Sequence, residues 1–328
     1  MDRIIYFGSS NFSKIILETL LEAKIKPLLV VTKPDAPKGR GLRLYQTQVA
    51  ETAQNNNIKI LKPDNLKKTD FLDKIAGINP NYLVIADYGK IIPALLLSIP
   101  KTLPLGIHPS LLPLYQGPAP IERTLLDGRQ LTGVTIFKLD KGIDTGPVLL
   151  QKKIKVDAND TYFTLSKKLA ALGAEALIES LYQAKDAPVN LQPQDTKKAT
   201  FAPKLVKQTG KINWKNSAAE IKNLIRATLK WPTAYTYYKN KVLKITEASA
   251  TQDKNAPNHK PPAIISKIDK SGIYVTTGSG ILKITKVKPE GKKEMPAWSF
   301  VCGHRVKEGD KFQNVQNHGS HKYKSHKS

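Results

Sequence analysis

The residues best suited to chemistry lie between positions 106 and 120, directly after an apolar run of strand length. This segment, Gly-Ile-His-Pro-Ser-Leu-Leu-Pro-Leu-Tyr-Gln-Gly-Pro-Ala-Pro, contains a single histidine, His108. A lone histidine is usually structural, but the prolines and the second glycine predict a rigid loop here. Ligands collect at the carboxyl ends of the strands in parallel sheets, so His108 is a candidate catalytic residue.

The second candidate is Asp144, in the segment Gly142-Ile143-Asp144-Thr145-Gly146 between two further predicted strands. An aspartate between glycines is by default a turn residue. We expect this turn at the same edge of the sheet as His108. A carboxylate and an imidazole on such loops can act as an acid–base pair, so the two residues together predict a site for proton transfer.

Other kinds of chemistry are not supported by the sequence. The turn after the first predicted strand, Gly8-Ser9-Ser10-Asn11-Phe12, lacks the second glycine of the dinucleotide fingerprint, which argues against an NAD-dependent enzyme. Cys302 is the only cysteine, so no intrachain disulfide can form. No Cys/His cluster has the spacing of a zinc site, and we expect no metal.

The elements that must position these residues alternate through the first half of the chain. Apolar runs of strand length are separated by helix-length amphipathic stretches, which is typical of parallel βαβ units. We therefore expect an α/β fold with a doubly wound, mostly parallel Rossmann-like sheet. The pattern predicts strands at 3–8, 27–32, 58–61, 82–88, 103–108, 133–139 and 148–156, and helices at 13–23 and 162–182.

A change of composition after residue 187 predicts a second, smaller domain. Prolines and polar residues suit a linker there, and the short β-rich segments beyond a helix at 217–228 suggest a barrel-like, OB-like domain. These segments lie at 234–239, 242–248, 263–268, 272–277 and 280–287. We assign residues 1–188 to a catalytic domain, 189–208 to a linker, 209–312 to the β-rich domain and 313–328 to a disordered basic tail.

The composition fits this division and adds a strongly positive charge. A length of 328 residues favours two domains. The formal net charge of +25 favours nucleic acid as a partner, although a solvated lysine-rich surface explains the charge equally well. We find no signal peptide and no apolar stretch of the ~18–20 residues that cross a bilayer, so we expect a soluble cytoplasmic protein.

Two of the motifs together resemble the signature of the folate-dependent formyltransferases. They are Ser110-Leu111-Leu112-Pro113-x-Tyr115-x-Gly117 and the later Gly142-Ile143-Asp144-Thr145-Gly146. Three further features are similar to the members of this family that formylate methionyl-tRNA: Lys33-Pro34-Asp35 with Gly39-Arg40-Gly41, the run from Lys204 to Trp214, and Pro289-x-Gly291-Lys292-Lys293. The resemblance covers nearly all of residues 1–310. It implies an enzyme that formylates the methionine of initiator methionyl-tRNA for translation initiation.

For catalysis, the resemblance implies roles for His108 and Asp144. Attack of an amine on a formyl group creates a tetrahedral oxyanion, which needs hydrogen-bond donors and a group that manages the amine proton. A protonated His108 would donate to the oxyanion. Asp144 would favour the charged imidazole and would pass a proton through a bound water.

One position departs from the family pattern. The family places an asparagine two residues before the histidine, as a further oxyanion donor, and this chain has Gly106 there. Loss of such a donor removes about 2.7–4 kcal/mol of transition-state stabilisation. Our hypothesis is that Asn11, Gln116 or a backbone N–H made accessible by the glycine supplies the missing hydrogen bond. A Gly106→Asn variant that formylated tRNA hundreds of times faster than the wild type would contradict it.

The resemblance also implies which residues contact the formyl donor, 10-formyltetrahydrofolate. Backbone donors and acceptors can read a flat pterin, so the pocket needs few conspicuous side chains. For Tyr88, a ring packed in the core and a ring touching the ligand are both compatible with the sequence. The implied contacts are Ser110, Leu111, Leu112 and Pro113, then Ala86, Asp87, Tyr88 and Gly89, and finally Asp140 and Gly142.

The remaining implied contacts concern the tRNA. The segment 33–43 is cationic and punctuated by glycine, and alone it would suggest a solvated, mobile loop. It resembles the insertion through which these enzymes enter the acceptor stem of tRNA. RNA binding through phosphates and single-stranded ends suits this loop and a β-rich domain. The implied contacts are Lys33, Lys38, Arg40, Arg43, Lys292 and Lys293, in a protein that we expect to be a monomer without a membrane partner.

Two alternatives stay open at this point. A formyltransferase with the same core loops could act on a small amine, such as an amino sugar or glycinamide ribotide, or hydrolyse formyltetrahydrofolate. The cationic loop and the basic second domain argue against a small substrate. The other alternative is an RNA-binding relative that has lost catalysis, which Gly106 favours and which the presence of His108 and Asp144 opposes.

Overall fold

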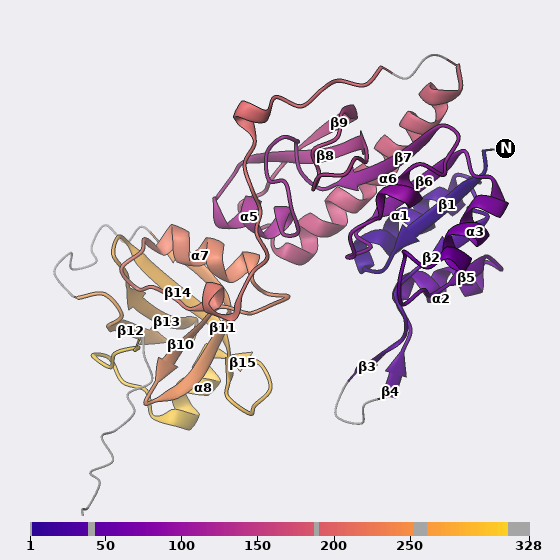
Figure 1. Ribbon diagram of the computed structural model, residues 1–328. Coiled ribbons are helices and arrows are strands. Elements are labelled where there is room, and N and C mark those ends of the chain that lie inside the picture. Colours follow the sequence, from indigo (N-terminus) through magenta and orange to yellow (C-terminus); the bar gives the residue numbers. More distant parts are fainter. Residues whose placement is uncertain (1, 39–42, 187–189, 252–260, 314–328) are drawn as a thin grey trace, which may run out of the picture. The chain divides into compact units, whose positions relative to one another are not determined.

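The computed structural model describes residues 2–38, 43–186, 190–251 and 261–313 of the chain (Figure 1). It separates into two compact units, which we describe one at a time. Unit 1 comprises Met1–Thr124 and Arg129–Lys204, and unit 2 comprises Leu125–Gly128 and the chain from Leu205 onward. Within the described ranges, no helix has both the length and the apolar character to span a membrane. Apart from residue 313, the predicted tail lies outside the described residues.

Unit 1 is built on one seven-stranded sheet with the strand order β5-β2-β1-β6-β7-β8-β9. The pairings from β5 through β7 are parallel, whereas β8 pairs antiparallel with both β7 and β9. The predicted fold class, a mostly parallel α/β sheet, is confirmed. The strands of unit 1 in this sheet are β1 (Ile4–Gly8), β2 (Leu29–Val31), β5 (Lys59–Leu61), β6 (Tyr82–Ala86), β7 (Leu103–His108), β8 (Leu131–Lys138) and β9 (Val148–Lys155).

Helices cover both faces of this sheet because its central strands are apolar on both sides. In β1, Ile5 and Phe7 pack with Phe71 of α3 on one face. Tyr6 points to the other face, where its hydroxyl donates to the Ser13 carbonyl of α1 at 2.6 Å. The helices are α1 (Asn11–Glu22), α2 (Gln48–Asn55), α3 (Thr69–Ile78), α4 (Ala94–Leu97), α5 (Pro120–Leu126) and α6 (Tyr162–Asp186).

Two short strands form a hairpin within the cationic segment that follows β2. Strand β3 (Ala36–Lys38) pairs antiparallel with β4 (Arg43–Tyr45). The segment is therefore not irregular throughout, since the backbones of these two strands pair with each other. Leu44 and Tyr45 on β4 are 70% and 51% exposed, so the hairpin carries apolar as well as cationic residues. Arg40 and residues 39–42 as a whole lie outside the described part of the chain.

Unit 2 is an antiparallel β domain with the strand order β10-β11-β14-β13-β12, and β15 pairs with β14. The segment 309–313 forms hydrogen bonds with both edge strands of this sheet, β10 and β12. Gln313 exchanges backbone hydrogen bonds with Tyr237 of β10, and the Ile265 N–H of β12 donates to the Asp310 carbonyl at 2.8 Å. This closure gives the predicted barrel-like form. The elements are α7 (Ala218–Ala227), β10 (Tyr235–Tyr238), β11 (Lys241–Thr251), β12 (Ile265–Asp269), β13 (Gly272–Thr276), β14 (Ile281–Pro289), β15 (Met295–Pro296) and α8 (Ala297–His304).

The core of unit 2 is centred on Trp214, which is 1% exposed. Its ring stacks on Phe312 with centroids 5.4 Å apart, and its indole N–H donates to Thr236 Oγ1 at 3.0 Å. Helix α7 begins with a reciprocal capping box between Ser217 and Glu220, which satisfies two backbone donors at the helix start. The second unit therefore has a hydrophobic core of its own.

Candidate active site

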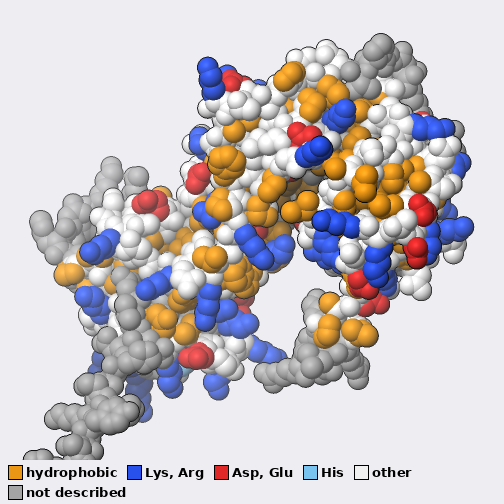
Figure 2. Space-filling model, in the orientation of Figure 1, with side chains coloured by type: hydrophobic (Ala, Val, Ile, Leu, Met, Phe, Trp, Pro, Cys, Tyr) orange, Lys and Arg blue, Asp and Glu red, His pale blue; other side chains and the backbone are white. Residues whose placement is uncertain are grey.

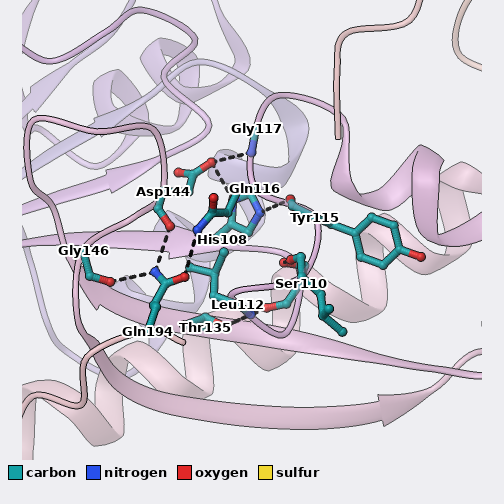
Figure 3. A network of polar contacts seen from close by, with 11 residues as sticks. His108, Ser110, Leu112, Tyr115, Gln116, Gly117, Thr135, Asp144, Gly146 and Gln194 are labelled. Carbon is teal, nitrogen blue, oxygen red and sulfur yellow. Dashed lines mark hydrogen bonds and ion pairs between the residues drawn. The ribbon is translucent and has the colours of Figure 1, made fainter. Parts of the chain in front are cut away.

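His108 is the last residue of β7, and two loops hold its imidazole (Figure 3). Its Nε2 lies 2.9 Å from the carbonyl oxygen of Tyr115. Its Nδ1 lies 3.5 Å from Oδ2 of Asp144, which is an ion-pair separation rather than a close hydrogen bond. Both partners are acceptors, so a ring with hydrogens on both nitrogens can donate toward both. The structure thus brings together the two residues that the motifs indicate.

The two side chains of the pair differ in exposure to solvent. His108 is 6% exposed, whereas the Asp144 side chain is 21% exposed. Because Nε2 is directed at the Tyr115 carbonyl, the Nδ1 edge of the ring is the one available to a reacting group. A substrate would therefore approach next to the Asp144 carboxylate.

The Asp144 turn is fixed by hydrogen bonds from both motifs. Asp144 has a φ of 56°, a left-handed conformation that aspartate tolerates better than most residues. Its Oδ2 accepts the Gly117 N–H at 2.8 Å. Within the turn, exposed Asp140 accepts the Gly142 N–H at 2.9 Å and the Thr145 hydroxyl at 2.8 Å. The carboxylate of Asp144 therefore connects the histidine loop to its own loop.

The turn from Ser110 to Pro113 is anchored to the neighbouring strands. Thr135 of β8, the register partner of His108, donates its hydroxyl to the Ser110 carbonyl at 2.7 Å and accepts the Leu112 N–H at 3.1 Å. Gln151 of β9 donates to the Leu112 carbonyl at 2.7 Å. Ser110 and Leu112 are buried, while Leu111 and Pro113 are partly exposed. Of the predicted folate contacts in this turn, the side chains of Leu111 and Pro113 are the more accessible.

The space next to Gly106 is filled by an aromatic ring. Gly106 pairs with Phe137 across β7 and β8, and a Cβ atom at position 106 would lie 2.5 Å from Cε1 and 2.7 Å from Cζ of that ring. Phe137 is only 2% exposed, so its ring is confined by the core. Residues 106 and 108 share one face of the strand. An asparagine at position 106 would thus collide with an apolar wall near the imidazole.

The two side chains considered as replacement donors differ in their surroundings. Asn11 is the first residue of α1 and is exposed. Gln116 is 6% exposed, and its Nε2 donates to Gln194 Oε1 at 3.0 Å. Gln116 directly follows Tyr115, whose carbonyl receives His108. Gln116 is accordingly the better placed of the two, and its role as an oxyanion donor stays a hypothesis.

The loop after β6 offers a ligand its backbone and Asp87 rather than its aromatic ring. Tyr88 is 1% exposed and packs edge-on against Phe7 with centroids 5.6 Å apart. Burial raises the pKa of the Tyr88 hydroxyl to about 12. Asp87 and Gly89 are exposed and adopt positive φ angles of 42° and 73°, while Ala86 is buried. Of the two possibilities for Tyr88, the ring packed in the core is the one that the structure shows.

The predicted tRNA contacts fall into two groups, one on each unit. On unit 1, Lys33 follows β2 and is partly exposed, and Lys38 and Arg43 are register partners in the β3–β4 hairpin. On unit 2, Lys292 and Lys293 are exposed in the turn between β14 and β15. Figure 2 shows many Lys and Arg side chains on the visible face of unit 2, with few acidic ones among them.

The sequence pattern alone missed three contacts of this site. Two of them are backbone groups, the Tyr115 carbonyl on His108 and the Gly117 N–H on Asp144. Both residues stand in the motif at 110–117, so the motif was a signal for them, although it did not reveal their roles. The third is Gln194, in the predicted linker, which donates to the carbonyl oxygens of Asp144 and Gly146. No local pattern around Gln194 signals this function.

Known proteins resemble both halves of this chain. Residues 2–181 match the formyl transferase family model, and residues 204–305 match the model of the formyl transferase C-terminal domain. The methionyl-tRNA formyltransferase of Thermodesulfovibrio yellowstonii is 40% identical over 306 residues, which cover 93% of this chain and 97% of that protein. The methionyl-tRNA formyltransferase of Caldicellulosiruptor saccharolyticus is 42% identical over 310 residues, or 94% of this chain and 98% of that protein.

Solved structures share the fold at much lower identity. HypX from Aquifex aeolicus aligns with a TM-score of 0.65 and 16% identity, over 94% of this chain. The chain spans 48%, about half, of HypX. The N-formyltransferase from Helicobacter canadensis, in complex with folinic acid and dTDP-3-aminofucose, aligns with a TM-score of 0.64 and 21% identity, over 87% of this chain and 99% of that one. At these identities the likeness shows a common fold and no more.

Proposed function

We propose a reaction on the basis of the family of this chain, which belongs to the formyl transferases and, within them, to the methionyl-tRNA formyltransferases. In this proposal the protein formylates the amino group of methionine on initiator tRNA. The formyl donor in this proposal is 10-formyltetrahydrofolate. The observation that carries the chemistry is the pair formed by His108 and Asp144, with Nδ1 and Oδ2 at 3.5 Å and an Asp144 side chain that is 21% exposed.

His108 is the hydrogen-bond donor in the proposed reaction. The amine nitrogen forms a bond to the formyl carbon, and the carbonyl oxygen becomes an oxyanion that needs donors aimed at it. The Tyr115 carbonyl fixes the ring through Nε2. Nδ1 lies 3.5 Å from Asp144 Oδ2, which is longer than a close hydrogen bond, and in this proposal its N–H donates to the formyl oxygen.

Asp144 has two tasks in the proposed reaction. Its carboxylate lies 3.5 Å from His108 Nδ1 and holds that edge of the ring next to the reacting groups. It also accepts the proton that the attacking amine loses. This proton then passes through a bound water to the folate nitrogen as the bond from that nitrogen to the formyl carbon breaks. The Gly117 N–H donates to Oδ2 at 2.8 Å and helps to hold the carboxylate beside His108.

Three loops would bind the folate in this proposal, namely 86–89, 110–113 and 140–142. They offer exposed backbone at Gly89 and Gly142, which suits the polar edge of a pterin. Two large apolar side chains follow these loops closely in sequence and are exposed: Ile91 is 82% exposed, and Ile143 is 63% exposed. Exposed apolar groups next to polar backbone fit a flat ligand that has an apolar face and a polar rim.

For the tRNA, we propose that the hairpin β3–β4 and the lysines of unit 2 supply phosphate contacts. The net charge of +25 and the exposed Lys292 and Lys293 support this role. The exposed Leu44 and Tyr45 suit unpaired bases at the end of a strand, because RNA-binding proteins stack such bases on apolar and aromatic side chains. A small amine as substrate would leave both features without a use.

The proposal is tested by incubating the purified protein with methionyl-tRNA and 10-formyltetrahydrofolate and separating blocked from free aminoacyl-tRNA on an acidic gel. We expect blocked methionyl-tRNA only when both substrates are present. Parallel reactions replace the tRNA with an amino sugar nucleotide, with glycinamide ribotide, or with buffer alone. Turnover of the folate with any of these, and none with methionyl-tRNA, would assign the chain to a different reaction.

A further inference from the structure

Residues 190–202, which we call the connecting segment, lie across both loops of the active site. Gln192 and Val148 of β9 exchange two backbone hydrogen bonds of 2.8 Å. Further along, the Gln116 N–H donates to the Thr200 carbonyl at 2.8 Å, and the Ala202 N–H donates to the Gln116 carbonyl at 2.7 Å. The connecting segment is thus tied down on either side of Gln194, and all of these residues belong to unit 1.

Gln194 holds the Asp144 turn by its backbone. Its Nε2 donates to the Asp144 carbonyl at 2.8 Å and to the Gly146 carbonyl at 2.7 Å (Figure 3). One amide group therefore bridges two carbonyls on either side of Thr145. The bridge spans the turn in which Asp144 adopts its left-handed conformation, with a φ of 56°.

Gln116 determines which way the Gln194 amide faces. Its Nε2 donates to Gln194 Oε1 at 3.0 Å, which leaves the Gln194 NH2 group for the two carbonyls. Gln116 itself directly follows Tyr115, the residue that receives His108 Nε2. The two glutamine side chains therefore form a continuous link between the loop that holds the imidazole and the loop that holds the carboxylate.

We infer that Gln194 is a positioning residue for Asp144 and that this one side chain of the connecting segment belongs to the active site. This inference rests on the proposed function and deepens it. The family models end at residue 181 and resume at residue 204, so neither of them includes Gln194. A carboxylate displaced by about 1 Å can lower catalysis by a factor of about 100.

The test compares Gln194→Met with Gln192→Met. Methionine keeps the length of glutamine but has neither an amide donor nor an amide acceptor. Gln192 is a matched control, since it lies in the same segment, is exposed, and donates from its side chain at 2.8 Å to Asn190, which is outside the catalytic loops. We expect Gln194→Met to lower kcat about 10- to 100-fold with little change in KM for either substrate, and Gln192→Met to leave both unchanged.

A second background separates positioning from a general loss of structure. In an Asp144→Asn enzyme, Gln194→Met should lower the residual kcat much less than it does in the wild type, because both changes act through the same carboxylate. An unchanged kcat in Gln194→Met would overturn the inference. An equal loss in both backgrounds, or a loss confined to KM, would overturn it as well.

Hydrogen exchange tests the same inference without relying on activity. We expect backbone amides of residues 140–146 to exchange faster in Gln194→Met than in the wild type and in Gln192→Met. Unchanged exchange in this turn would contradict the inference that Gln194 holds it. If the wild type failed to formylate methionyl-tRNA, the proposed function would be wrong, and the exchange result would still decide whether Gln194 holds the Asp144 turn.

Discussion

The active-site edge of unit 1 and the lysine-rich surface of unit 2 are organised in opposite ways. At the edge, a few groups are interlocked: His108 has a partner on each ring nitrogen, and Asp144 has partners on its carboxylate and on its carbonyl. On unit 2, most lysines of the described residues are exposed, and they lie on different strands and turns, for example Lys241, Lys270 and Lys292. Lys286, for example, is paired with Glu247 in solvent at 2.7 Å.

This contrast indicates where single substitutions should matter. In an interlocked and partly buried site, removal of one group leaves its partners misplaced or unpaired, and the loss is large. On an exposed cationic surface, each lysine adds a small, screened share to the attraction of a polyanion. Chemistry should therefore depend on single residues of unit 1, and tRNA affinity should depend on many residues together.

The largest effect should follow from changes to the catalytic pair. We expect His108→Ala and Asp144→Asn each to lower kcat/KM about 100- to 10,000-fold, because each removes a proton-transferring or hydrogen-bonding group from the transition state. Steady-state formylation of methionyl-tRNA measures the effect. Folate affinity and thermal unfolding, followed in parallel, control for damage to the fold. If either variant kept a tenth of the wild-type rate, the assignment of this pair to the chemistry would fail.

The next effect concerns Gly106 and its cross-strand partner Phe137. We expect Gly106→Asn to destabilise the protein by about 1–3 kcal/mol, because its Cβ would overlap the ring, and to lower rather than raise activity. Phe137→Leu removes the two ring atoms nearest to position 106. The double variant should therefore lose less stability than the sum of the two single variants. Strict additivity in urea unfolding, or a faster Gly106→Asn enzyme, would contradict this account.

Much of the fold, and the proximity of His108 and Asp144, could be predicted from the sequence, because both depend on local patterns. Alternating apolar runs place β7 and β8, and the end of β7 places His108 at the ligand edge. Asp144 was predictable for the same reason, since a glycine-flanked turn between two strands returns to that edge. The antiparallel pairing of β8 was not predictable in this way, because an apolar strand does not encode its direction.

Long-range contacts account for what the sequence did not reveal. Phe137 fills the space at Gly106 only because the register of β7 and β8 pairs these two residues. Gln194 reaches the Asp144 turn across 50 positions of sequence, from a segment whose composition predicts a linker. For Tyr88, periodicity could not reveal that the ring packs against Phe7.

A smaller effect is expected on the lysine-rich surface, at Lys292 and Lys293. We expect each single alanine variant to raise KM for tRNA modestly and to leave kcat unchanged. The double variant should lower the slope of log KM against log salt by about one for each phosphate that is no longer neutralised. Lys14→Ala, which removes a lysine already paired with Glu18 on α1, is the control and should not change this slope. A salt slope unaffected by the double variant would remove these lysines from the tRNA-binding surface.

The smallest effect concerns stability alone, at a turn of unit 2 remote in sequence from the catalytic pair. Hydrogen bonds from Ser271, first its hydroxyl and then its N–H, together with Lys267, outweigh desolvation and lower the pKa of Asp269 to about 2 from an ordinary 3.8. A carboxyl with a lowered pKa in the folded state stabilises that state above the unfolded pKa, and this contribution is lost as the pH falls from about 4 through about 2. Asp269→Asn should therefore be less stable than the wild type in urea at pH 7, and the gap should narrow on acidification over that range.

Ser271→Ala should reproduce part of this effect, since it removes the largest cause of the pKa shift of Asp269. A stability gap that stayed constant with pH would show that the turn is held by its backbone geometry and not by the charge of Asp269. The stability of unit 2 would then not depend on this charged group, in contrast to the dependence on single groups that we expect at the active-site edge of unit 1.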